Sequence, residues 1–263
     1  MIETTILETK KGKAAKMKNP VFICGLPGIG LVGKLAAEHI IKEAKGALVA
    51  VLYSPSFPHH VIMRKNGTMR MLKNKFYLVK NNGRDILILV GDVQAMTPEA
   101  QYEIAGKILD YIQPKGCREI ITLGGYGTGK IIPAPRVLGS AISKKFVASY
   151  KKYGVIFGET RGAIIGAAGL IPMLARLRGM KAVCLMGETH GAYADPKSAQ
   201  SIVLILNKIL GLNVGIGKLE ERAKASERFM KNIEDEAKKQ MNYLSKGDDL
   251  SYIRRYWLAI NYC

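Results

Sequence analysis

A chain of 263 residues, 48% of them hydrophobic, is long enough to bury one large α/β core, or one such domain with an appendage. The formal net charge of +19 suits an acidic partner or simple solubility and does not choose between them. Aromatic residues make up only 7% of the chain and no RNA-binding signature accompanies the charge, so specific nucleic-acid binding is not favoured.

The cysteines and the apolar runs bear on compartment and metal binding. Cys24, Cys117, Cys184 and Cys263 contain no C-x-x-C pair, so the pattern favours neither a zinc site nor a disulfide framework. Cys24 and Cys184 stand in apolar runs and are expected to be small buried hydrophobes. The N-terminus has no apolar signal core, and the longest nearly apolar run, residues 162–175, is too short to span a bilayer. We therefore expect a cytoplasmic protein with no metal site and no membrane partner.

In chain order, the first 18 residues predict a short strand and then a basic linker. Apolar runs, glycine turns and amphipathic segments then alternate as strands and helices. The run at residues 47–53 is continuously apolar, as in a buried parallel strand. We expect strands at residues 21–25, 47–53, 119–123, 155–158 and 181–187, a Gly/Pro loop at 124–135, and helices at 29–45, 97–113, 136–152 and 196–210.

Two hairpins interrupt this alternation. Lys65-Asn66-Gly67 separates residues 60–64 from residues 68–72, and Asn81-Asn82-Gly83-Arg84 divides residues 75–90 in the same way. Antiparallel strands of this kind extend or cap a parallel sheet. The sequence therefore predicts an α/β fold, with a mostly parallel sheet, flanking helices and an antiparallel hairpin insertion.

A glycine loop follows the first long apolar run. The glycine spacing of residues 28–33 matches the dinucleotide fingerprint, and with Lys34 it matches most of a phosphate loop. The first motif also needs an acid about twenty residues further on, and no Asp or Glu lies between Glu43 and Asp85. The second needs Ser or Thr after the lysine, where Leu35 stands. We therefore expect no nucleotide cofactor, and glycines that let the helix pack close to the sheet.

Four glycine-rich loops follow predicted strands, at the edge where α/β folds bind ligands. In the most polar of them, an enzyme would use Glu188 or His190 as a general base. In the alternative interpretation, Glu188 accepts backbone N–H bonds and Asp195 caps a helix. No complete catalytic constellation is visible, so we expect no enzyme, and a small-molecule or anion-binding enzyme is the alternative. The candidate rim residues are Gly25, Pro27, Gly28, Gly30, Gly33, Asp92, Gly124, Gly125, Tyr126, Glu188, Thr189 and Asp195.

The character of the sequence changes after Leu212. Apolar residues step by three and four along a highly charged segment from about Lys218 to Lys246, the pattern of a heptad helix. This helix either lies against its own domain or pairs between subunits, and we expect it to pack on neighbours. Residues 1–212 would then form the α/β domain, and residues 213–263 a coiled-coil-like helix and tail. The candidate oligomer contacts are Leu219, Met230, Ile233 and Met241.

Four motifs follow one another along the chain. Residues 25–33 read G-x-P-G-x-G-x-V-G, residues 90–94 read V-G-D-x-Q, residues 123–126 read L-G-G-Y, and residues 185–196 read L-x-G-E-T-x-G-x-x-x-D-P. Together they resemble the proteasome assembly chaperone 2 family, in its archaeal branch, over about residues 20–212. The resemblance implies a fold similar to purine nucleoside phosphorylases. It also implies a homo-oligomeric chaperone or activator that engages α-subunits of the proteasome core particle, without established catalysis.

The C-terminal tail departs from this family pattern. Some relatives dock through a final hydrophobic residue, a tyrosine and one further residue. Here Tyr262 is penultimate and Cys263 is last, but Asn261 replaces the hydrophobic residue. Tyr252 and Ile253 belong to an earlier segment that looks like such a tail, with ten residues after it. The resemblance makes Tyr262, Cys263, Tyr252 and Ile253 the candidate partner-docking residues.

Overall fold

The computed structural model describes residues 3–159, 161–225 and 228. The chain divides into two compact units, Met1–Glu220 and Glu221–Cys263, and the elements below belong to the first. Its helices are α1 (Lys10–Ala14), the 3₁₀ turn η1 (Ile29–Leu31), α2 (Val32–Glu43), α3 (Pro98–Ile112), α4 (Lys144–Lys151), α5 (Ala167–Leu177) and α6 (Pro196–Leu210). Its strands are β1 (Thr5–Glu8), β2 (Val21–Gly25), β3 (Ala47–Tyr53), β4 (Val61–Met63), β5 (Met69–Met71), β6 (Asn74–Val79), β7 (Ile86–Gly91), β8 (Glu119–Gly127), β9 (Val137–Ala141), β10 (Ile156–Phe157) and β11 (Lys181–Thr189).

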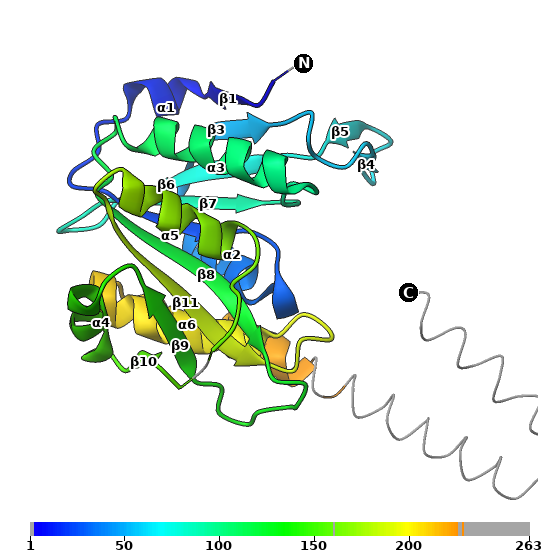
Figure 1. Cartoon of the computed structure of the whole chain (residues 1–263). Coiled ribbons are helices and arrows are strands. Elements are labelled where there is room, and N and C mark those ends of the chain that lie inside the picture. The colour runs from blue at the N-terminus through cyan, green and yellow to red at the C-terminus, as the bar shows by residue number, and fades with distance from the viewer. Residues whose placement is uncertain (1–2, 160, 226–227, 229–263) are drawn as a thin grey trace, which may run out of the picture. The chain divides into compact units, whose positions relative to one another are not determined.

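One nine-stranded sheet organises the unit, in the order β1-β3-β6-β7-β2-β8-β11-β9-β10. Strands β7, β2, β8 and β11 are parallel and form its centre. Antiparallel strands β6, β3 and β1 extend one side, while β9 runs antiparallel to β11 on the other. The hairpin β4–β5 forms a separate two-stranded sheet (Figure 1). The predicted α/β class and the hairpin insertion are confirmed.

Helices cover both faces of the sheet, and the alternation of side chains along β2 shows how. Phe22 and Cys24 point into a core shared with α3 and α5, whereas Val21 and Ile23 point into a second core with α2 and α6. Figure 1 shows α3 and α5 on the near side of the sheet. Because a strand buried on both faces carries apolar residues at every position, β2 is a continuous apolar run. None of the described helices is both long and apolar enough to cross a bilayer.

Two helices begin where local capping signals predict them. Thr97 Oγ1 accepts a hydrogen bond from the N–H of Ala100, with Pro98 at the first position of α3. Asp195 Oδ1 accepts a bond from the N–H of Ser198 at 2.9 Å and starts α6 in the same way. Both predicted starts are confirmed.

The structure corrects the parallel placement of β3. The strand pairs antiparallel with both β1 and β6. Its apolar character has another cause, because the short helix α1 covers it. A Cβ atom on Gly12 would lie 2.0 Å from the Val49 carbonyl oxygen, which shows how closely the two elements approach. The predicted basic linker therefore contains a helix that packs on the sheet.

Two further expectations were wrong in the central part of the chain. Residues 124–127, predicted to begin a loop, continue β8 because they pair with β11 through Gly127. Residues 136–152, predicted to be one helix, divide into β9 and α4. The strand β9 forms because it pairs with β11 and β10, and Gly139 leaves room for β10, since a Cβ atom there would lie 2.5 Å from the Phe157 ring. These pairings join segments distant in sequence and leave no local signal.

Candidate functional site

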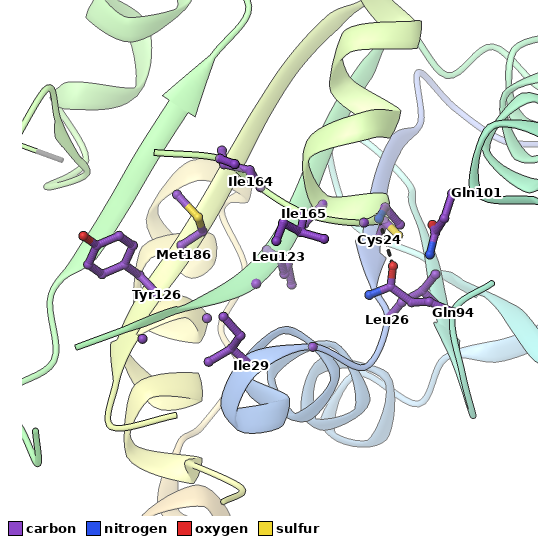
Figure 2. A pocket seen from close by; sticks show the side chains of 18 residues that line it. Cys24, Leu26, Ile29, Gln94, Gln101, Leu123, Tyr126, Ile164, Ile165 and Met186 are labelled. Atoms are coloured by element: carbon purple, nitrogen blue, oxygen red, sulfur yellow. Dashed lines mark hydrogen bonds between the residues drawn. The ribbon is translucent and has the colours of Figure 1, made fainter. Parts of the chain in front are cut away.

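A cavity of about 570 Å³ lies where β2 and β8 end and the helix α5 begins (Figure 2). Its walls come from the loop after β2, the end of β8 and residues 163–168 before and at the start of α5. Figure 2 shows Tyr126 at one end, and Leu26 and Gln94 at the other. The volume falls within the range of roughly 300–1,000 Å³ that small-molecule pockets occupy.

The lining of this cavity is mainly apolar. Among the described residues, no charged side chain lines it, and its polar side chains are Gln94, Gln101 and Tyr126. Gln94 Nε2 donates to the Pro27 carbonyl at 2.6 Å, while its Oε1 accepts from the N–H of Ala167 at 2.9 Å. Gln94 thus clips the loop after β2 to the start of α5. The cavity suits an apolar group better than a phosphate or carboxylate, which bears against the anion-binding alternative.

Most glycines in residues 25–33 lie in close contact with neighbouring elements, with no room for a side chain. A Cβ atom on Gly25 would lie 2.4 Å from the Ala37 Cβ, and one on Gly33 would lie 2.3 Å from the Leu123 carbonyl oxygen. Gly30 has a φ of +60°, which favours glycine, and its Cβ would meet the Thr189 hydroxyl at 2.7 Å. Gly28 alone in this loop faces open space on the side of a Cβ. The predicted close packing of helix on sheet is confirmed.

The L-G-G-Y motif forms the end of β8. A Cβ atom on Gly125 would lie 2.3 Å from the Ile29 carbonyl oxygen, so this glycine lets the loop after β2 cross the strand. Gly124 faces the cavity, with Ala168 and Met186 at ordinary contact distance from a Cβ. Five of the candidate rim residues therefore lie at this cavity. Four of them line it, namely Gly28, Gly124, Gly125 and Tyr126, and Pro27 is joined to it by the hydrogen bond from Gln94 to its carbonyl.

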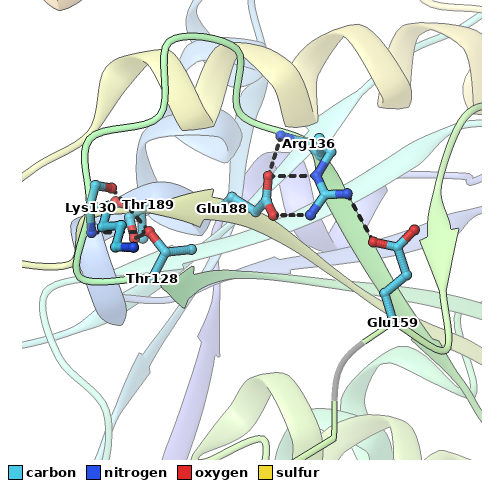
Figure 3. Close-up of polar contacts among 6 residues, drawn as sticks. All are labelled: Thr128, Lys130, Arg136, Glu159, Glu188 and Thr189. Atoms are coloured by element: carbon cyan, nitrogen blue, oxygen red, sulfur yellow. Dashed lines mark hydrogen bonds and ion pairs between the residues drawn. The ribbon is translucent and has the colours of Figure 1, made fainter.

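Glu188 lies outside this cavity and is engaged by an arginine (Figure 3). Its Oε2 accepts bonds from the backbone N–H and Nε of Arg136, both at 3.0 Å, and its Oε1 accepts from Arg136 Nη2 at 2.6 Å. The Arg136 guanidinium also reaches the exposed Glu159 at 2.9 Å. These bonds from Arg136 hold the pKa of the Glu188 carboxyl below its ordinary value. A buried, ionised and fully engaged carboxylate is poorly suited to act as a general base.

The neighbouring polar residues hold the loop after β11. Thr189 Oγ1 donates to Asp195 Oδ2 at 2.7 Å, and Asp195 caps α6. His190 Nδ1 accepts from the N–H of Ala192, and its Nε2 lies 3.8 Å from Asp195 Oδ2. The cluster joins a helix cap to a loop turn, as the alternative interpretation of this segment predicts.

Asp92 stands apart from the cavity and binds the hairpin. Its Oδ1 accepts from Arg70 Nη2 at 3.0 Å, its Oδ2 accepts from Arg70 Nη1, and Oδ2 also accepts from the N–H of Lys73 at 3.0 Å. Burial works to raise the pKa of the Asp92 carboxyl, but the bonds from Arg70 and from the Lys73 N–H, with the positive charges of Arg70 and Lys34, together outweigh it and hold this pKa below its usual range. The structure thus brings the cavity residues together and separates Asp92 and Glu188 from them.

A model of the PAC2 family matches residues 22–234, which is most of the chain. The chain belongs to the PAC2 family. Its solved relatives include the Pyrococcus furiosus protein PbaB, an archaeal proteasome activator, with 42% identity and a TM-score of 0.84, over 89% of this chain and 100% of PbaB. Pyrococcus furiosus PbaA, an archaeal homolog of proteasome-assembly chaperone, is 28% identical with a TM-score of 0.74, over 93% and 97% of the two chains. An uncharacterised protein of Methanocaldococcus jannaschii is 34% identical over 257 residues, 96% of this chain and 99% of that protein.

Parts of the candidate site carry no recognisable signal in the sequence. Residues 163–168 form one wall of the cavity, but their small and apolar side chains carry no motif. Arg136 was placed at the start of a helix, whereas it precedes β9 and pairs with Glu188 across 52 residues of sequence. A basic residue immediately before an apolar strand was the available signal, and it is a weak one.

Of the candidate residues in the C-terminal part, only Leu219 lies within the residues that the structure describes. Leu219 is fully buried in the core of the first unit, beside α2 and α6 residues, as a helix lying against its own domain would require. Met230, Ile233 and Met241 lie outside the described residues, as do the tail residues Tyr252, Ile253, Tyr262 and Cys263.

The described cysteines of this PAC2 protein are expected to resist alkylation. Cys24 lines the cavity, yet burial raises the pKa of its thiol to about 12, and burial raises the pKa of Cys117 to about 12 and that of Cys184 to about 11. Because the thiolate is the reactive form, iodoacetamide at pH 8 should leave all three unmodified in the folded protein and modify them in urea. Peptide mass spectrometry distinguishes the sites. Labelling of native Cys24 would contradict this expectation and mark an accessible, reactive cavity.

Proposed function

We propose that this protein is a cytoplasmic proteasome assembly chaperone or activator that binds proteasome α-subunits as a homo-oligomer and catalyses no reaction. The observation that carries the proposal is the 42% identity and TM-score of 0.84 to a proteasome activator whose whole chain is covered. The M. jannaschii relative is matched over 96% of this chain and 99% of its own length, so the similarity extends beyond residues 1–212.

The chemistry of the rim loops also supports a binding protein. Glu188 is held by Arg136, Asp195 caps α6, and several glycines of the loops are required by close packing. The polar residues that suggested catalysis therefore have structural partners. Free thiols at Cys24 and Cys184 suit the reducing cytoplasm in which proteasome partners would be met.

For the C-terminal part we propose a role in assembly and docking. Residues 1–212 would serve as the α/β domain, and residues 213–263 as the oligomer helix and tail. Met230, Ile233 and Met241 would contact neighbouring subunits along the heptad stripe. Tyr262 and Cys263 would reach the α-subunits, with Tyr252 and Ile253 as the earlier docking segment.

Deleting Asn261–Cys263 is expected to weaken the binding of α-subunits at least about tenfold, because the Tyr262 anchor would be lost and the terminal carboxylate would move to Ile260. The measurement is the retention of purified α-subunits by the tagged full chain and the truncated chain, at low and moderate salt. Moderate salt separates specific retention from attraction to the +19 charge.

The matched control for this deletion is Asn261→Leu, which keeps the length and restores a hydrophobic residue at the third position from the end. It is expected to bind at least as strongly as the unaltered chain. Equal retention by the truncated, substituted and unaltered chains would exclude a role for the tail. No retention by the unaltered chain would overturn the proposed function itself.

A further inference from the structure

The hairpin β4–β5 carries an apolar face whose side chains are half to mostly exposed. The register pairs Val61 with Met71 and Met63 with Met69, so all four side chains lie on the same face of the two-stranded ladder. Their exposed fractions are 50%, 50%, 83% and 70%, in that order. Large apolar side chains gathered at this exposure mark an interaction surface more often than isolated ones do.

The opposite face of the hairpin is anchored, which fixes the direction of the exposed face. Ile62 packs against the core, and Arg70 binds Asp92 through both carboxylate oxygens. Phe57 and Leu72 are buried where the two strands leave the body of the protein. Figure 1 shows the hairpin projecting beyond β3. The apolar face is therefore presented outward by a fixed element.

The rim of this face is basic. Arg64 and Lys65 are exposed at the turn, which is closed by a bond of 2.8 Å from the N–H of Arg64 to the Thr68 carbonyl. No acidic residue occurs between Glu43 and Asp85, so no carboxylate of the hairpin offsets these charges. An apolar centre with a cationic rim is complementary to an apolar patch bordered by carboxylates.

We propose that this face, Val61, Met63, Met69 and Met71, docks an acidic protein surface that exposes apolar side chains. The inference rests on the proposed function and places that surface on a proteasome α-subunit. Three of the four residues are methionine, whose flexible, polarizable side chain adapts to irregular apolar surfaces. The hairpin is thus a second docking element, separate from the C-terminal tail.

Other occupants fit this face less well. A second copy of the chain would bring two basic turns together, and like charges oppose that contact. Residues 58–75 contain no Phe, Tyr or Trp on which nucleic-acid bases could stack or which could anchor the hairpin at a membrane interface. An acidic protein surface with exposed apolar side chains is complementary to both the apolar centre and the positively charged rim.

The test compares two methionines of nearly equal exposure, Met69 and Met96, in the full chain. Met69→Glu puts a negative charge on the face, whereas Met96→Glu puts one on a loop methionine that is 72% exposed. Binding of purified α-subunits should fall at least tenfold for Met69→Glu and less than twofold for Met96→Glu. Because both side chains are exposed, neither substitution should affect folding. Equal melting temperatures of the two variants and the unaltered chain would confirm this. The charge reversal Arg64→Glu with Lys65→Glu should slow association and reduce its dependence on salt.

Binding by Met69→Glu within twofold of the unaltered chain overturns the hairpin's role and leaves the proposed function supported. No binding by the unaltered chain overturns both. A change in oligomer mass by light scattering with Met69→Glu, without loss of α-subunit binding, assigns the face to contacts between copies. Unchanged α-subunit binding with lost retention on phosphatidylserine vesicles or single-stranded RNA replaces the protein partner by a membrane or a nucleic acid.

Discussion

Gly33→Ala is expected to lower the free energy of unfolding by about 2–3 kcal/mol, the cost of overpacking a filled core. The added Cβ would lie 2.3 Å from the Leu123 carbonyl oxygen of β8. The obstacle is backbone on a central strand, so relief requires α2 to move away from the sheet. Alanine's preference for helices offsets little of this, because Gly33 is the second residue of α2. Urea unfolding followed by circular dichroism measures the difference.

Gly28→Ala is the matched control from the same loop. A Cβ atom there meets nothing within 4 Å, and the backbone is extended with a φ of −160°, which any residue adopts. The free energy of unfolding should change by less than about 0.5 kcal/mol. Comparable losses in the two variants would contradict the packing explanation. A tolerated Gly33→Ala would return the motif to a ligand-binding interpretation.

The sequence predicted best those features that depend on neighbouring residues. The Thr97-Pro98 and Asp195-Pro196 signals start α3 and α6 because a cap and a proline act within one helical turn. The Asn66-Gly67 turn likewise specifies the hairpin between β4 and β5. In each case the interaction that determines the structure joins residues at most a few positions apart.

The errors have a common physical origin in contacts between distant segments. The apolar run of β3 predicts that the strand is buried, but it does not predict the direction in which the strand runs. The helix α1, a separate segment, covers β3. Residues 136–152 alternate too weakly to show that β9 pairs with β11, about forty residues further along the chain. Strand order is decided by such pairings.

The candidate site shows the same division. Its glycines were predicted to serve packing, and the distances at Gly25 and Gly33 confirm it. The two possible roles of Glu188 could not be separated, because the choice depends on Arg136, 52 residues away. Residues 163–168 carry no polar motif, so the cavity they complete was not predicted.

Glu188→Gln is expected to lower the free energy of unfolding by about 2 kcal/mol near neutral pH, since hydrogen bonds to charged groups contribute roughly 1.5–3 kcal/mol. Only 5% of Glu188 is exposed, and both carboxylate oxygens accept from Arg136. In either orientation of a glutamine amide, its NH₂ group would face an N–H donor of Arg136, where a hydrogen-bond acceptor is needed. Thermal and urea unfolding measure the loss. Glu159→Gln is the matched control, because Glu159 meets the same guanidinium in solvent, and it should leave stability unchanged.

The effect of Glu188→Gln is expected to depend on pH in one direction. Bonds from Arg136 hold the pKa of the folded Glu188 carboxyl below its ordinary value of 4.5. The stability that the ionised carboxylate contributes is therefore fully present above about pH 4.5 and is lost as pH falls through the lower, folded-state pKa. The difference between the unaltered chain and Glu188→Gln should be constant near neutral pH and shrink in acid. A difference that grows on acidification would mean that the folded protein holds the Glu188 carboxyl protonated, which would make it a candidate proton donor beside the rim loops.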